Sequence, residues 1–131
     1  MPKKSKILII DDDRDFLDAT SMVLESSSYQ VITSADGDDG LRKVKRERPD
    51  LVLLDVIMPV KDGFSVAEIM KKDPQLAKIP VVMLTSFSQR KGETSVSVAQ
   101  GMELEAEDYL SKPVAPDELL RRVKKWLKAG R

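Results

Sequence analysis

The stretch Leu51-Val52-Leu53-Leu54, followed at once by Asp55, decides the fold of this chain. Four consecutive apolar residues that stop at a carboxylate are typical of a strand buried on both faces, as in parallel sheets covered by helices. Two further runs have the same form: Ile7–Ile10 is followed by Asp11, and Val81–Leu84 is followed by Thr85. The sequence therefore predicts a parallel sheet whose strands end in polar side chains.

Segments with helical periodicity lie between the apolar runs. We expect strands at 7–10, 31–33, 51–54, 81–84 and 109–110, and helices at 13–26, 38–47, 64–72, in part of 89–105 and from 116 to 130. Strands that alternate with helices predict an α/β fold with helices on both faces of the sheet. The 131 residues suit one domain, which we place at 1–131 with a core from about 6 to 128.

The composition excludes several kinds of chemistry. The chain has no Cys and no His, so thiol nucleophiles, disulfides and the commonest transition-metal ligands are absent. Lys plus Arg and Asp plus Glu both number 22, and this balance gives no reason to expect binding to nucleic acid or to a membrane surface. We see no apolar stretch as long as a signal peptide or membrane span and expect a cytoplasmic location.

Polar side chains at the ends of the predicted strands form the candidate site. They are Asp11, Asp12, Asp55, Thr85 and Lys112. The carboxyl ends of parallel strands meet at one edge of the sheet, where ligands bind in open α/β folds. Carboxylates packed together repel unless a cation joins them, and a set of oxygen ligands favours Mg²⁺. An Asp carboxylate can also act as a nucleophile and form an aspartyl-phosphate.

Four segments carry a resemblance to a known family: ILIIDDD (7–13), PDLVLLDVIMPVKDG (49–63), IPVVMLT (79–85) and AEDYLSKPV (106–114). With these segments the chain resembles the receiver domain of bacterial two-component response regulators, of the chemotaxis type. They follow the order found in the family and span nearly the whole chain. The resemblance implies a flavodoxin-like three-layer sandwich, with a five-stranded parallel sheet of order 2-1-3-4-5 flanked by five helices.

The resemblance also implies a metal site and a phosphorylation site. Asp55 resembles the phosphoacceptor, and Asp12 resembles the direct Mg²⁺ ligand. Asp11 resembles the second acidic residue, which often acts through water, and the backbone carbonyl of Ile57 would be a further ligand. Mg²⁺ is the implied cofactor, with Mn²⁺ as a substitute.

A second group of residues resembles the switch of the family. Thr85 resembles the hydroxyl that turns toward the phosphoryl group, and Tyr109 resembles the aromatic residue that moves inward behind it. Lys112 resembles the lysine that pairs with Asp55, and the Lys112–Pro113 bond would be cis. We expect phosphorylation to shift the last strand and helix between two states.

The implied function is phosphorelay signalling. A sensor histidine kinase or a histidine phosphotransfer protein would donate the phosphoryl group, and output would pass by contact to a downstream protein. The face of the last strand and helix would serve a homodimer. We expect a phosphoacceptor domain that catalyses its own phosphorylation, not an enzyme acting on a separate substrate, without contacts to nucleic acid or membrane.

The chain departs from the family in two places. The stretch between Thr85 and Lys112 is a few residues longer than usual, with the extension at Gly101–Ala106. Ile57 and Phe87 occupy positions that tune hydrolysis in the family, and both are apolar here. An apolar side chain cannot orient a water by hydrogen bonding, so we predict slow self-dephosphorylation.

Each of these residues also has a plainer interpretation. An N-terminal helix cap accounts for Asp13 and competes with metal binding for Asp12. Thr85 on its own would be a strand residue, and Lys112 a surface lysine. The basic residues near the end of the chain indicate a solvated helix face, Trp126 a core residue, and the methionines core filler.

Two other functions compete with the receiver interpretation. A phosphatase of the haloacid dehalogenase class also uses a nucleophilic Asp, but it needs a second Asp two residues on, where this chain has Ile57. A phosphorylation-independent interaction domain could use the same fold without metal binding. Fast turnover of a phosphate ester would favour the first, and failure to bind Mg²⁺ the second.

Overall fold

The computed structural model describes residues 4–56, 58, 62–85 and 106–129. The strands are β1 Lys6–Ile10, β2 Gln30–Ser34, β3 Leu51–Asp55, β4 Val81–Thr85 and β5 Asp108–Ser111. The helices are α1 Arg14–Ser26, α2 Gly37–Glu47, α3 Gly63–Lys72 and α5 Pro116–Ala129. The strands form one parallel sheet of order β2-β1-β3-β4-β5, which confirms the predicted topology.

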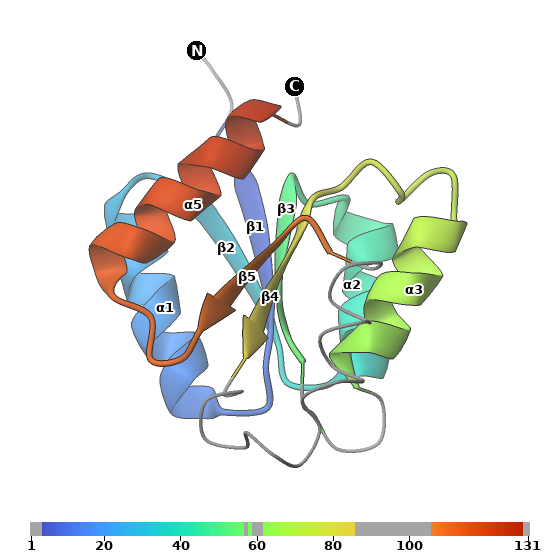
Figure 1. The fold of residues 1–131 in the computed structure, drawn as a ribbon, viewed down its shortest axis with the longest axis horizontal. Helices are drawn as coiled ribbons and strands as arrows, with labels where there is room; N and C mark the ends of the chain where they lie inside the picture. Colours follow the sequence, from blue (N-terminus) through green and yellow to red (C-terminus); the bar gives the residue numbers. More distant parts are fainter. Residues whose placement is uncertain (1–3, 57, 59–61, 86–105, 130–131) are drawn as a thin grey trace.

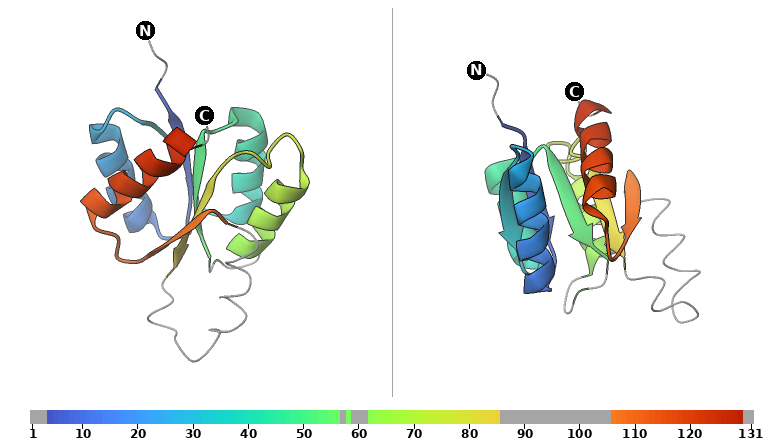
Figure 2. Two further views of the ribbon diagram at one scale, coloured as in Figure 1. Left: turned by 45° about the horizontal axis from the view of Figure 1, so that its top comes forward. Right: turned by 90° about the vertical axis from the view of Figure 1, so that its left-hand side faces the viewer.

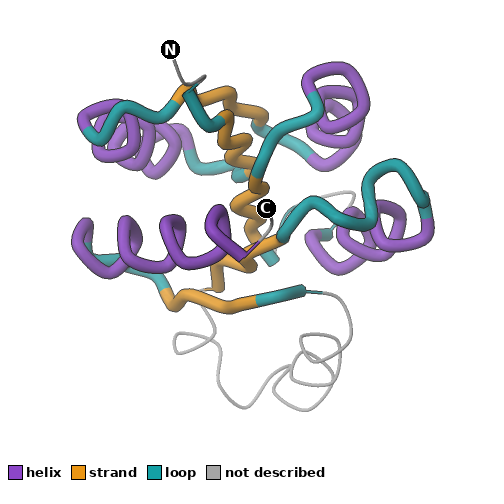
Figure 3. The backbone as a smooth tube through the Cα atoms, turned by 90° about the horizontal axis from the view of Figure 1, so that it is seen from above, coloured by secondary structure: helices purple, strands orange, loops and turns teal. Residues whose placement is uncertain are grey.

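The molecule has three layers. Helices α1 and α5 cover one face of the sheet, and α2 and α3 cover the other (Figure 1). Figure 3, which looks at the molecule from above, shows the strands in a central row between the two helical layers. The second panel of Figure 2 shows α1 and α5 side by side on their face. The arrowheads of the strands all point toward the same edge, and this edge carries the polar side chains considered below (Figure 1).

The apolar runs are buried on both faces, as their composition predicts. Ile7–Ile10 and Leu51–Leu54 have no exposed surface. Leu8 and Ile10 belong to the core beneath α2 and α3, whereas Ile7 and Ile9 belong to the core beneath α1 and α5. Successive side chains of a strand point to opposite faces, so a continuous apolar run is the pattern that a two-sided core requires.

Acidic side chains cap three of the helices. Asp13 caps α1 and accepts hydrogen bonds from the backbone N–H groups of Asp15 and Phe16, which confirms its interpretation as a cap. Asp36 caps α2 and Asp62 caps α3 in the same way.

The structure explains one glycine and corrects one expectation. Gly40 of α2 is buried, and a Cβ atom there would lie 2.5 Å from the Cδ1 atom of Ile10. A glycine is thus needed for the close approach of α2 to β1, and this packing outweighs the low helix propensity of glycine. Met22 is 69% exposed and is not core filler, although Met70 and Met83 are fully buried.

The expected number of helices is tested only in part. Four helices lie in the described ranges, and the fifth, predicted within 89–105, falls outside them. Within the described ranges no helix has both the length and the apolar character needed to cross a membrane.

Candidate functional site

The carboxyl ends of the strands bring the predicted site residues together. Asp11 follows β1, Asp55 ends β3, Thr85 ends β4, and Lys112 follows β5. Asp11, Asp55 and Thr85 are almost completely buried, with exposed fractions of 0%, 5% and 3%. Polar groups so deeply buried need partners, because burial of an unpaired charge is costly. The site is therefore built to hold charges in close proximity.

Three carboxylates form a compact cluster at this edge. One oxygen each of Asp11, Asp12 and Asp55 lies within 4.8 Å of the others. Asp11 and Asp55 are buried, whereas Asp12 is exposed, so the cluster is open to solvent at Asp12. Oδ1 of Asp11 accepts a hydrogen bond of 2.9 Å from the backbone N–H of Asp13. This bond fixes the turn that leads from β1 into α1.

Lys112 supplies positive charge to the cluster. Its ammonium nitrogen lies 2.5 Å from Oδ2 of Asp11 and 3.8 Å from Oδ2 of Asp55. It also lies 4.4 Å from the centre of the Phe16 ring, within the range of a cation–π contact. Phe16 lies on α1, and its contact with the site depends on how α1 packs against the segment from Pro113 to Leu119 that leads from β5 into α5. The sequence carries no signal for this contact.

The donor set fits a hard divalent cation. Asp11 Oδ2 is buried and, among the described groups, receives no hydrogen bond, because the ammonium of Lys112 approaches it outside hydrogen-bond geometry. Among the residues that the structure describes, three carboxylates face one ammonium group, so this part of the cluster keeps an excess of negative charge. Oxygen ligands, excess negative charge and one open side are what Mg²⁺ requires when it retains waters and accepts phosphoryl oxygens.

Gly63 is a site residue that the sequence reasoning missed. Its backbone N–H donates a hydrogen bond of 2.9 Å to the carbonyl of Val56. A Cβ atom at this position would lie 2.2 Å from the backbone oxygen of Asp55. The first turn of α3 thus packs directly on the backbone that carries the proposed phosphoacceptor. In the sequence, the signal for this close contact is the glycine that directly follows Asp62, at the start of the predicted helix.

The predicted switch residue Tyr109 lies on the edge strand β5. It is half-buried, and its hydroxyl donates a hydrogen bond of 3.5 Å to the carbonyl of Ala106. The Lys112–Pro113 bond is cis, as the resemblance implied. Ile57 and Phe87, the residues predicted to tune hydrolysis, lie outside the described residues, as does the extension apart from its last residue, Ala106.

The side chain of Asp108 joins β5 to α5. It accepts hydrogen bonds from the Tyr109 N–H, from the Arg122 guanidinium at 2.7 Å and from the Trp126 indole at 2.7 Å. Burial alone would raise the pKa of Asp108, but the hydrogen bonds from Trp126, Tyr109 and Arg122 together outweigh it and lower the pKa.

The half-buried Trp126 therefore has a polar role as well as its expected packing role. The other basic side chains of α5, namely Arg121, Lys124, Lys125 and Lys128, are exposed, which confirms a solvated face.

Comparisons with known proteins agree with this geometry. Residues 7–124 match the family described as the response regulator receiver domain. The alkaline phosphatase synthesis transcriptional regulatory protein PhoP of Bacillus subtilis is 40% identical over 123 residues, covering 94% of this chain and 48% of PhoP. The chain thus spans about half the length of this curated relative.

Solved structures show the same fold. A CheY-like receiver domain protein from Methanospirillum hungatei superimposes with a TM-score of 0.86 at 30% identity, covering 98% of this chain and 97% of that chain. The receiver domain of the sensor histidine kinase PA1611 from Pseudomonas aeruginosa, solved with a magnesium ion coordinated in its active site cleft, gives a TM-score of 0.84 at 26% identity, covering 96% and 99%. From the family match, the shared topology and the acidic cluster beside Lys112, we conclude that this chain belongs to the response regulator receiver domain family.

Proposed function

We propose that the chain is a Mg²⁺-dependent phosphoacceptor switch in a phosphorelay, with Asp55 as the residue that takes the phosphoryl group. The observation that carries this proposal is the meeting of Asp11, Asp12 and Asp55 within 4.8 Å, with the ammonium group of Lys112 beside them. A nucleophilic carboxylate, a cation site and a fixed ammonium group are the parts that phosphoryl transfer to Asp requires.

The transfer follows from this arrangement. An oxygen of the Asp55 carboxylate forms a bond to phosphorus while the bond between phosphorus and the histidine nitrogen of the donor breaks. The histidine nitrogen retains the electron pair and takes up a proton. Lys112, 3.8 Å from Asp55, is placed to pair with the phosphoryl oxygens. A bound Mg²⁺, held by Asp11, Asp12, Asp55 and the Ile57 carbonyl, would supply the remaining positive charge.

Burial of Asp55 limits access of water to the acyl phosphate. With 5% of its surface exposed, Asp55 offers little area to attacking water. The apolar residues Ile57 and Phe87 occupy positions that flank the phosphorylation site in the sequence pattern of the family, and we propose that they slow hydrolysis.

The output in this proposal runs through Thr85 and Tyr109. Thr85 ends β4 and pairs in register with Ser111, while Tyr109 pairs with Met83 on the same two strands. The phosphoryl group on Asp55 carries about two negative charges and three acceptor oxygens, in place of the single charge of the carboxylate. The hydroxyl of Thr85 would donate to one of them, and Tyr109 would follow into the space that Thr85 leaves.

The partners are part of the proposal. A histidine kinase or a histidine phosphotransfer protein donates the phosphoryl group, and a downstream protein or a second copy of the chain reads the β5–α5 face. Of the relatives named above, PhoP is a transcriptional regulatory protein, and the PA1611 domain is the receiver domain of a sensor histidine kinase. A receiver domain that signals by contact with another protein or domain is compatible with both kinds of protein.

The test is intact mass after incubation with a small phosphodonor such as acetyl phosphate and Mg²⁺. We expect one phosphate adduct in the wild type, none in Asp55→Asn, and none in the wild type with EDTA. An adduct that persists in Asp55→Asn would refute the assignment of the phosphoacceptor. Absence of both an adduct and metal binding in the wild type would leave a phosphorylation-independent interaction domain.

A further inference from the structure

A polar network lies at the start of α2, outside the acidic cluster but joined to it by one backbone hydrogen bond. The N–H of Asp11 donates to the carbonyl of Ser34, the last residue of β2, at 3.0 Å. This bond continues the pairing of β1 with β2 past Ile10. The orientation of the peptide that carries Asp11 therefore depends on the position of Ser34.

Ser34 is held in turn by the carboxylate of Asp39. The Ser34 hydroxyl is buried and lies 2.7 Å from Oδ2 of Asp39 and 3.0 Å from the carbonyl of Asp36. A hydroxyl has one hydrogen, and the charged, nearer acceptor is favoured. The hydrogen bond from Ser34 and the neighbouring Lys43 lower the pKa of Asp39, so the carboxylate is ionised at neutral pH.

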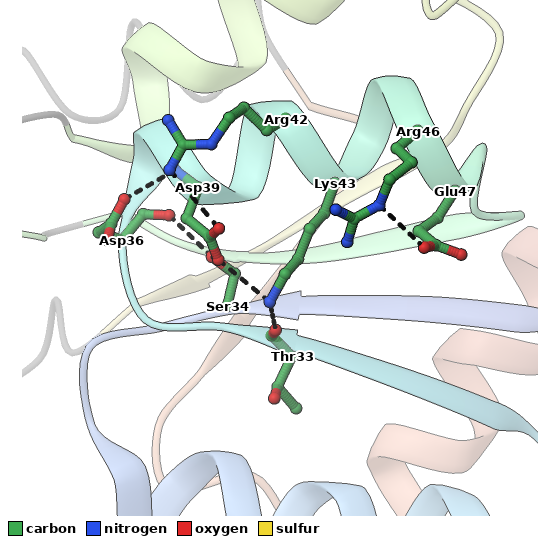
Figure 4. A network of polar contacts seen from close by, with 8 residues as sticks. All are labelled: Thr33, Ser34, Asp36, Asp39, Arg42, Lys43, Arg46 and Glu47. Carbon is green, nitrogen blue, oxygen red and sulfur yellow. Dashed lines mark hydrogen bonds and ion pairs between the residues drawn. The ribbon is translucent and has the colours of Figure 1, made fainter.

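Lys43 completes the network, as Figure 4 shows. Its ammonium nitrogen lies 3.1 Å from Oδ2 of Asp39 and donates a hydrogen bond of 2.6 Å to the carbonyl of Thr33. One ion pair on α2 thereby holds both of the last two residues of β2. The exposed Arg42 adds a looser contact of 3.6 Å to the other oxygen of Asp39.

The packing of α2 leaves little freedom for this end of the sheet. Gly40, next to Asp39, lies so close to Ile10 that there is no room for a Cβ atom. Ile10 directly precedes Asp11. The first turn of α2 thus contacts the segment of Asp11 twice, by packing on Ile10 and by the polar path from Asp39 through Ser34.

We propose that Asp39, acting through Ser34 together with Lys43, is a positioning residue of the metal site. This inference rests on the proposed Mg²⁺ site, and it adds a group that does not itself touch the metal. Groups that orient metal ligands change metal affinity by about 10- to 100-fold when they are removed. Asp39 sets the position of the buried Asp11 carboxylate and so the affinity of the cluster for a divalent cation.

The test compares Asp39→Asn with Glu47→Gln. Both changes remove one carboxylate charge from α2, but Glu47 lies at the opposite end of the helix, where it pairs with Arg46 (Figure 4). Glu47 also pairs with Lys6 of β1. Mn²⁺ affinity is measured from the electron paramagnetic resonance signal of free Mn²⁺, and Mg²⁺ affinity by competition. We expect about a 10-fold weaker affinity for Asp39→Asn and no change for Glu47→Gln.

A second readout does not depend on the metal. Hydrogen exchange of the Asp11 amide in the metal-free protein should be faster in Asp39→Asn and unchanged in Glu47→Gln. If Asp39→Asn does not fold, Lys43→Met is used in its place, because methionine keeps the aliphatic part of the lysine side chain. We expect the same weaker Mn²⁺ affinity and faster exchange of the Asp11 amide.

The outcomes separate the inference from the proposed function. If folded Asp39→Asn binds Mn²⁺ as tightly as the wild type, and its Asp11 amide exchanges at the wild-type rate, the positioning role of Asp39 is overturned. A wild type that binds no Mn²⁺ or Mg²⁺ refutes the proposed metal site, and the exchange of the Asp11 amide still decides whether Asp39 orders that segment.

Discussion

Replacement of Gly63 by alanine tests whether the first turn of α3 sets the position of Asp55. The added Cβ atom would lie 2.2 Å from the Asp55 carbonyl oxygen, 2.9 Å from the Cα atom of Val56 and 3.0 Å from the Asp55 carbonyl carbon. All three atoms belong to the backbone, so no side-chain rotation relieves the contact. A carbon and an oxygen in van der Waals contact are about 3.2 Å or more apart, so α3 and the end of β3 must separate by about 1 Å.

The energetic cost follows from this separation. Overpacking of a well-packed site costs about 1–3 kcal/mol, and the separation also lengthens the hydrogen bond from the Gly63 N–H to the Val56 carbonyl, now 2.9 Å. Alanine in a helix recovers up to about 1 kcal/mol relative to glycine. We expect a net loss of about 1–2 kcal/mol in the free energy of unfolding, measured by urea denaturation.

The effect on phosphoryl transfer should exceed the effect on stability. A displacement of about 1 Å at a reacting group can lower a rate by about 100-fold, because the attacking oxygen no longer aligns with the phosphorus. The assay is the rate of phosphate adduct formation by intact mass, at a temperature where both proteins are folded. We expect Gly63→Ala to slow this rate by at least about 10-fold.

Gly40→Ala is the matched control. The three atoms nearest to its Cβ atom would all belong to the side chain of the buried Ile10, at 2.5, 2.9 and 3.1 Å, and none to Asp55. Its stability should also fall, but at saturating Mg²⁺, which offsets an effect on the segment of Asp11, its rate of adduct formation should fall less than that of Gly63→Ala. The reasoning is refuted if Gly63→Ala matches the wild type in both stability and rate, or if Gly40→Ala slows adduct formation as much as Gly63→Ala.

Three further predictions concern pH, lifetime and output. Because the pKa of Asp108 is lowered on folding, its hydrogen bonds stabilise the protein fully above the ordinary value of 3.8, and this contribution is lost as pH falls through the lower folded pKa. The fluorescence of Trp126, the sole tryptophan, should report that titration through its bond to Asp108, and a midpoint at or above 3.8 would contradict the shift. Because Ile57 and Phe87, the residues expected to tune hydrolysis, are both apolar, the phosphorylated protein should decay slowly once the donor is removed. Intact mass follows the decay, and a half-life of seconds would disprove this. Thr85→Ala should still accept a phosphoryl group but should lose the shift of the β5 amide resonances that phosphorylation causes in the wild type, and a retained shift would exclude Thr85 as the switch.

The sequence alone determined the sheet and the edge at which the site lies. Buried strands such as Leu51–Leu54 need apolar residues on both faces, and this requirement is visible as an uninterrupted run. The residue that follows each run lies at the carboxyl edge whatever the details of packing. For this reason the sequence alone assigns Asp11, Asp55, Thr85 and Lys112 to one site.

Tertiary structure decided which residues support that site. Phe16 contacts Lys112 because α1 packs against the connection from β5 to α5, and Gly63 contacts the backbone of Asp55 because α3 begins directly against β3. The path from Asp39 to Asp11 likewise crosses from α2 through β2 to β1. Periodicity reports which face of an element is apolar, whereas contacts between layers depend on the distance and rotation of the elements, which only the packed molecule determines.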